Sequence, residues 1–197
     1  MERNSFLYAL LVDPVTGDPL VLDTDKGMLL SRSGQSKYRL TEGIPEIFSP
    51  GGEGDRSTPL HSDHGSFFRY RSHYQADAEI FDYSEEDESI SNRHELKRLR
   101  QYIIRVSGKK YNTILDIGCG KGWAAEMLLP AGKKVISMDI SSRNPLTAIR
   151  NYPHPSHAGL IADVYDIPLR KDSIDCIIAS QMLEHLPDPG EAIEEMI

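Results

Sequence analysis

Three aspartates and a glycine-rich segment have the residue types and spacing that could hold a small polar ligand. Glycines recur at Gly118, Gly120 and Gly122, directly after Asp116 and Ile117. Such a turn lets the backbone approach a ligand closely, and amide groups of a helix that begins there can face it. Asp139 could accept hydrogen bonds from both hydroxyls of a ribose, and Asp163 is placed to contact the amine of an adenine. Together they indicate a site for an adenosine-containing ligand.

The position of the third glycine separates this segment from the dinucleotide-binding pattern. That pattern has its third glycine three positions after the second, where this chain has Trp123. Here the glycine falls at Gly122 instead, which disfavours NAD as the ligand. A tight strand-to-helix turn without any ligand remains the structural alternative.

The elements that must position these residues alternate along the second half of the chain. Apolar runs predict strands over 113–117, 134–140, 159–164 and 174–180. Helical spacing predicts helices over 96–106, 123–129 and 145–152. Strands interleaved with helices of this length imply a parallel sheet covered on both faces, an α/β Rossmann-like fold.

The first fifty residues have a different pattern. Apolar runs over 6–12, 20–22, 28–30 and 38–40 are separated by Asp-Pro, Gly and Ser clusters, which predicts a small all-β module over 1–49. The segment that follows is rich in Gly, Pro and Ser, so residues 50–66 are predicted to be a linker. The α/β domain then occupies 67–197.

From about Arg100 to its end the chain resembles the class I S-adenosylmethionine-dependent methyltransferases, in particular the small-molecule and quinone-type group. The resemblance implies that the first motif surrounds the methionine part of the cofactor; its residues are Asp116, Gly118, Cys119, Gly120 and Gly122. It implies that Asp139 binds the ribose, with Ile140 packing on the adenine and Asp163 and Val164 at the adenine edge. After the fourth strand, Ser180 and Gln181 would line the cofactor.

His185 is the candidate catalytic residue, because the resemblance places it on the substrate side. The sulfonium carries its own leaving group, so the protein needs only to align a nucleophile and remove its proton where necessary. A histidine suits that proton removal, although His185 could equally cap or pack its loop. The acceptor is expected to be a small molecule, a glycan or a lipid precursor. An RNA base methyltransferase and a non-catalytic, cofactor-binding partner subunit are the alternatives.

The first module resembles a small zinc-ribbon family that includes the activator subunit of tRNA and rRNA methyltransferases. Asp13, Thr16 and Ser31 stand where that family has cysteines, so no thiolate remains to hold zinc. The sequence His61-x-Asp63-His64 is more typical of a polar loop, and no metal is expected. So small a module should lean on the methyltransferase domain and serve in docking or substrate presentation.

Composition limits the partners and the compartment. A net charge of -8 argues against nucleic acid as the main partner. The first apolar segment is too short for a membrane span, and two cysteines far apart suggest no disulfide, so the cytoplasm is expected. An aromatic segment from Tyr70 to Tyr83 is expected to pack in the core or to form a lid over the cofactor.

The resembled family has seven strands, whereas only four are predicted here. The fourth, 174–180, would then lie at an exposed edge of the sheet. We therefore expect a C-terminally truncated sheet, belonging to a fragment of a longer protein or completed by a dimer or a partner chain.

Overall fold

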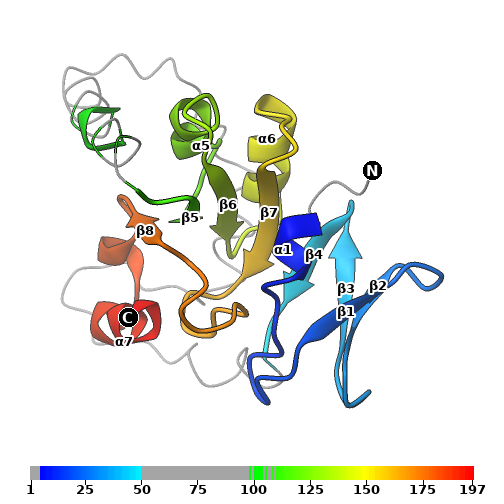
Figure 1. Ribbon diagram of the computed structural model, residues 1–197. Coiled ribbons are helices and arrows are strands. Elements are labelled where there is room, and N and C mark those ends of the chain that lie inside the picture. The colour runs from blue at the N-terminus through cyan, green and yellow to red at the C-terminus, as the bar shows by residue number, and fades with distance from the viewer. Residues whose placement is uncertain (1–4, 50–97, 99, 104, 106–107, 109) are drawn as a thin grey trace.

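The computed structural model describes residues 5–49, 98, 100–103, 105, 108 and 110–197. Its strands form one sheet in the order β1-β2-β3-β4-β7-β6-β5-β8, which runs across the molecule in Figure 1. The strands are β1 (Leu20–Asp23), β2 (Met28–Ser31), β3 (Lys37–Thr41), β4 (Ile44–Ile47), β5 (Thr113–Ile117), β6 (Lys134–Asp139), β7 (His157–Ala162) and β8 (Cys176–Ala179). The helices are α1 (Ser5–Tyr8), α5 (Trp123–Leu128), α6 (Arg143–Asn151), the 3-10 turn η1 (Leu183–His185) and α7 (Pro189–Met196).

The α/β part confirms the predicted alternation. β7, β6, β5 and β8 are neighbours and all parallel, with α5 and α6 in the predicted places. The largest shift is in β7, which spans His157–Ala162 rather than 159–164. It ends earlier because the Asp163 side chain accepts a hydrogen bond from the backbone amide of Tyr165 and starts a turn.

Parts of the prediction fall outside the described residues. Within the predicted helix 96–106, the described residues 98, 100–103 and 105 are helical. The predicted linker, the aromatic segment and the His61-x-Asp63-His64 sequence are not among the described residues. In the described part of the chain, no helix has the length and apolar character needed to cross a membrane.

Both faces of the parallel sheet are buried, as expected for strands covered by other elements. On one face, Val135 of β6 packs in a cluster with Ala125 and Leu128 of α5. On the other face, Ile136 and Met138 belong to a larger cluster that also contains Leu7 of α1. Alternate residues of β6 therefore face two different cores, one of which includes the N-terminal residues.

The sequence predicted an all-β N-terminal segment, but the structure also contains a helix there. Its first apolar run forms α1 and then short bridges at Leu11 and Val12, so the prediction that this run belongs to an all-β module is wrong. Apolar residues at 6, 7, 10 and 11 also fit a helical period, and a run this short does not distinguish the two. The other three runs are the strands of an antiparallel meander that continues into β4.

β4 joins the meander to the α/β part by pairing in parallel with β7. Glu46 lies opposite Ile161, and Ile47 lies opposite Ala162. The larger core contains residues of both parts, including Leu20, Leu29 and Ile47 from the meander and Leu160 from β7. The expectation that the small module leans on the larger domain is therefore confirmed, since the two share a sheet and a core.

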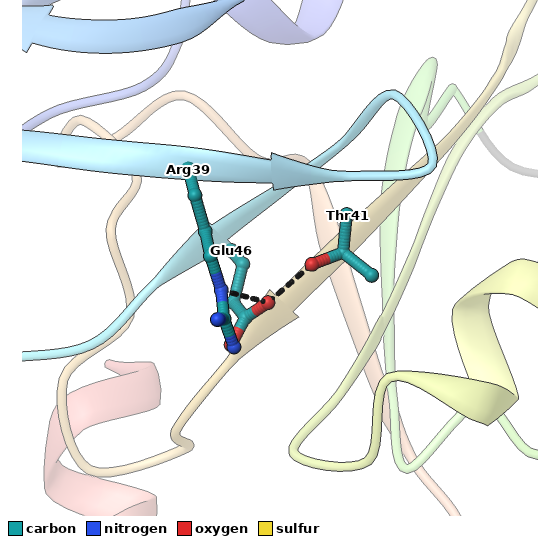
Figure 2. A network of polar contacts seen from close by, with 3 residues as sticks. All are labelled: Arg39, Thr41 and Glu46. Carbon is teal, nitrogen blue, oxygen red and sulfur yellow. Dashed lines mark hydrogen bonds and ion pairs between the residues drawn. The ribbon is translucent and has the colours of Figure 1, made fainter.

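A charged residue is buried at this junction. The Glu46 side chain is only 5% exposed, and its carboxylate accepts hydrogen bonds from Arg39 and Thr41 of β3, shown in Figure 2. The Arg39 Nε donates to Glu46 Oε2 at 2.8 Å, and a second guanidinium nitrogen pairs with Oε1. This bidentate pair compensates for removing the carboxylate from water next to β7.

Candidate functional site

The carboxyl ends of β5, β6, β7 and β8 meet at one edge of the sheet. Ile117 at the end of β5 lies opposite Met138 of β6 and Ala179 of β8, and Asp139 lies opposite Ile161 of β7. The residues that follow these strand ends therefore gather at the same edge; they include Gly118, Ile140, Asp163 and Ser180. In open α/β sheets this is the edge at which ligands bind.

Asp116 has a buried carboxyl group. It is 5% exposed, and no residue in the described part of the chain donates a hydrogen bond to its side chain. Burial, and then the nearby charge of Asp139, raise the pKa of Asp116 to about 7. A buried acid without donors costs free energy unless a cation or a donor reaches it, so this carboxyl group indicates a place for a positively charged ligand group.

Asp139 is held rigidly at the end of β6. Its Oδ1 accepts a hydrogen bond from the amide of Ser141, and its Oδ2 accepts one from Asn144 Nδ2, both at 2.9 Å. Burial raises the pKa of this carboxyl group, whereas these bonds act in the opposite direction. Asn144 lies in the first turn of α6, and the sequence did not predict its contact with Asp139. A polar residue at the start of the helix after the strand could have indicated it.

The three glycines of the turn serve different purposes. A Cβ on Gly118 would lie 2.9 Å from Cβ of Met182, and a Cβ on Gly122 would lie 2.9 Å from Cβ of Ala148. These two glycines therefore allow close packing against the β8 loop and α6. A Cβ on Gly120 would meet no atom of the described residues within 4 Å, so within that part of the chain the open space at this turn lies at Gly120.

Cys119 contributes backbone rather than a thiol to the turn. The side chain is buried, and its Sγ faces the Gly120 carbonyl oxygen at 3.7 Å. Burial and the nearby carboxylates raise the pKa of the thiol well above its usual value, so the reactive thiolate is disfavoured.

The loop after β8 lies against the glycine turn. Ser180 is half-buried. The exposed Gln181 has a φ of 52°, which lies in the left-handed region that residues other than glycine rarely adopt. Met182 then packs against Gly118, and η1 carries His185, whose side chain is exposed. A strained backbone of this kind persists only where the surrounding structure holds it, and such positions are common at functional sites.

The turn after β7 begins at the same edge of the sheet. Asp163 is half-buried and Val164 is buried, while Ile140 is half-buried after β6. The hydroxyl group of Tyr165, a residue that the sequence analysis did not select, accepts a hydrogen bond from the amide of Asp188 at 2.9 Å. This contact ties the turn to the beginning of α7.

Asp13 forms a hydrogen-bonded turn at one of the positions where the zinc-ribbon family has a cysteine. It is fully buried and accepts bonds from the amides of Val15 and Thr16 and from the hydroxyl group of Tyr38. Within the described ranges, no three His, Cys, Asp or Glu residues gather in a way that could hold a metal ion. The resemblance to that family remains a proposal.

Comparison with known sequences matches residues 115–197 to a family described as a methyltransferase domain. The ubiquinone biosynthesis O-methyltransferase of Pasteurella multocida is 32% identical over 120 residues, covering 51% of this chain and 47% of the relative. The enzyme of the same name from Azotobacter vinelandii is 32% identical over 113 residues, covering 51% and 45%. The chain thus spans about half the length of the curated relatives it matches.

Two solved structures share the fold. One is a complex between the Trm112 methyltransferase activator of Haloferax volcanii and a methyltransferase, with a TM-score of 0.51 and 22% identity over 62% of this chain and 53% of that one. The other is the N-methyltransferase NodS of Bradyrhizobium japonicum with S-adenosyl-l-homocysteine, with a TM-score of 0.51 and 20% identity over 64% and 66%. At this identity the similarity concerns the fold alone.

Proposed function

We propose that this chain transfers a methyl group to a small-molecule acceptor. The premise is that residues 115–197 form a class I S-adenosylmethionine-dependent methyltransferase domain. The domain assignment follows from the matched family. The acceptor and the activity of the whole protein are inferences from the site and from the relatives.

The observation that carries the proposal is the buried carboxyl group of Asp116, to which no described residue donates a hydrogen bond, together with the space at Gly120 that no described atom fills. S-adenosylmethionine brings an ammonium group and a sulfonium, and either cation suits a buried carboxylate. Asp139, already fixed by Ser141 and Asn144, would accept hydrogen bonds from the ribose hydroxyls. The residues present therefore fit this cofactor.

The remaining contacts follow the same edge of the sheet. Ile140 and Val164 would flank the adenine, and Asp163 would accept a hydrogen bond from its amine. Ser180 and Gln181 would line the cofactor from the β8 side, where Gln181 has its left-handed backbone. When bound, the cofactor supplies an electrophilic methyl group with its own leaving group, so the chain needs mainly to bind and orient.

For the acceptor we propose a hydroxyl group of a small molecule, with glycans and lipid precursors in the same class. The relatives named above are O-methyltransferases, and their sequences match half of this chain. The exposed His185, on a loop that packs against Gly118 through Met182, would take the hydroxyl proton.

Calorimetry with the purified chain tests cofactor binding. S-adenosylmethionine should bind in the micromolar range, and Asp139→Ala should abolish binding because it removes the proposed ribose acceptor. Asp172→Asn is the matched control, since Asp172 is an exposed residue in the left-handed region that asparagine tolerates. A folded wild-type chain that releases no heat with the cofactor would refute the proposal.

Transfer is tested with methyl-labelled cofactor and a panel of small phenols. His185→Ala should lower transfer at least tenfold at neutral pH while cofactor affinity stays unchanged. Equal transfer rates for the wild type and His185→Ala would exclude His185 as the base.

A further inference from the structure

The N-terminal residues bind directly to the segment that follows Asp163. The amide of Val12 donates to the carbonyl oxygen of Pro168 at 3.0 Å, and the amide of Arg170 donates to the carbonyl oxygen of Leu10 at 2.8 Å. Between these two bonds, Leu11 pairs in antiparallel fashion with Leu169. Residues 10–12 thus form a two-bond clamp on residues 168–170.

The clamped segment is also held from the opposite end. The Tyr165 hydroxyl accepts from the Asp188 amide at 2.9 Å, and the Ile167 amide donates to Glu195 Oε1 at 2.9 Å. Residues 163–168 contain no helix or strand, so these contacts and the clamp hold the segment in place. Asp163, the proposed adenine contact, begins it.

The N-terminal residues also contact helix α6, which carries a hydrogen-bond donor to Asp139. Ile44 of β4 packs so closely on β7 that a Cβ on Gly159 would lie 2.7 Å from its Cδ1, and Ile149 of α6 lies at the same place. Glu42 forms an ion pair with Arg150 near the end of α6. The other end of this helix carries Asn144, which bonds Asp139.

We propose that residues 5–49 are a built-in positioning element for the adenosine half of the cofactor site, acting on Asp163 through the clamp and on Asp139 through α6. The inference rests on the proposed function. It follows because a loop that must be ordered on binding reduces affinity, whereas a loop already fixed by other contacts does not.

The test is Val12→Pro, which removes the amide that donates to Pro168 and leaves the β4–β7 pairing untouched. Asp25→Pro is the matched control: it also removes one backbone donor of the same segment, but that bond stays within the β1–β2 turn. Affinities for S-adenosylhomocysteine and for adenosine are measured by calorimetry, together with hydrogen exchange of the amides of 163–170.

Val12→Pro should weaken both ligands about tenfold, the equivalent of one well-placed contact, and speed exchange over 163–170. Any proton release at Asp116 on S-adenosylmethionine binding should stay the same as in the wild type. A general loss of structure would change it. Asp25→Pro should bind as the wild type does. Should Val12→Pro not fold, Leu11→Val loosens the same clamp with a smaller side chain, and should give a smaller effect in the same direction.

The outcomes separate the two proposals. A wild-type chain that binds neither S-adenosylmethionine nor S-adenosylhomocysteine refutes the proposed function and this inference with it. A wild type that binds, together with a folded clamp variant that exchanges faster over 163–170 yet binds equally well, refutes the positioning role alone.

Discussion

Asp116 and Asp139 lie on neighbouring strands with their carboxyl groups on the same face of the sheet, and burial together with the charge of Asp139 raises the pKa of Asp116 to about 7. Asp139 accepts hydrogen bonds, among them those from Ser141 and Asn144, whereas no residue in the described part of the chain donates to Asp116. The two acids of the site are therefore unequal: one is a fixed acceptor, and the other changes charge near neutral pH.

The affinity for S-adenosylmethionine should rise with pH. Below about pH 7 the free protein holds a proton on Asp116, and a bound cation must displace it. We expect the association constant to fall about tenfold for each pH unit below 7. Calorimetry in buffers of different ionisation enthalpy should detect the released proton at pH 6 and none at pH 8.

The pH dependence should disappear in Asp116→Asn, which cannot ionise. Asp172→Asn again serves as the control and should keep the wild-type profile. Proton release that persists in Asp116→Asn would assign the titration to another group.

Without cofactor, Asp116 should make the protein less stable as pH rises. Its pKa is higher in the folded chain than the ordinary value of 3.8, so the folded state binds more protons between about pH 4 and pH 7. Stability is then highest at the acidic end of this window and decreases through it. Asp116→Asn should melt several degrees above the wild type at pH 8, and the gap should close towards pH 4, as thermal unfolding would show.

Gly120→Ala and Gly122→Ala should separate ligand binding from folding. Gly120→Ala places a methyl group where no described atom lies within 4 Å, so the chain should fold with a cost of about 1 kcal/mol for its left-handed backbone and should lose cofactor affinity. Gly122 has a φ of 92°, and a Cβ added there would lie close to Ala148. The unfolding free energy of Gly122→Ala should therefore fall by more than about 2 kcal/mol. Denaturant unfolding and calorimetry on both variants would check this, and equal loss of stability would contradict it.

A size exchange tests how tightly β4 packs on β7. Gly159→Ala alone should destabilise by about 1–3 kcal/mol, because its Cβ would lie 2.7 Å from Cδ1 of Ile44. Ile44→Val removes that carbon and should recover part of the loss in the double variant. Unfolding free energies of the four combinations give the coupling, and strict additivity would show that the two side chains do not meet.

Much of the α/β part could be predicted because its signals are local. The apolar runs of β5, β6 and β8, and the glycines after β5, indicate strand, turn and helix within a few residues of each other. The carboxyl ends of parallel strands necessarily meet at one edge, so Asp139 and Asp163 could be predicted to lie at the same edge of the sheet. The N-terminal helix α1 was missed because its apolar residues fit two periods.

Thus the sequence by itself determined the order of strands and helices in the α/β part and the residues that follow the carboxyl ends of its strands. Only the tertiary structure decided that β4 pairs with β7, since backbone hydrogen bonds between distant strands carry no residue signature. It likewise decided that Gly122 packs against Ala148 whereas no described atom lies near Gly120, and that no residue in the described ranges donates to Asp116. Those properties depend on which atoms of distant segments come into contact, and spacing along the chain does not contain that information.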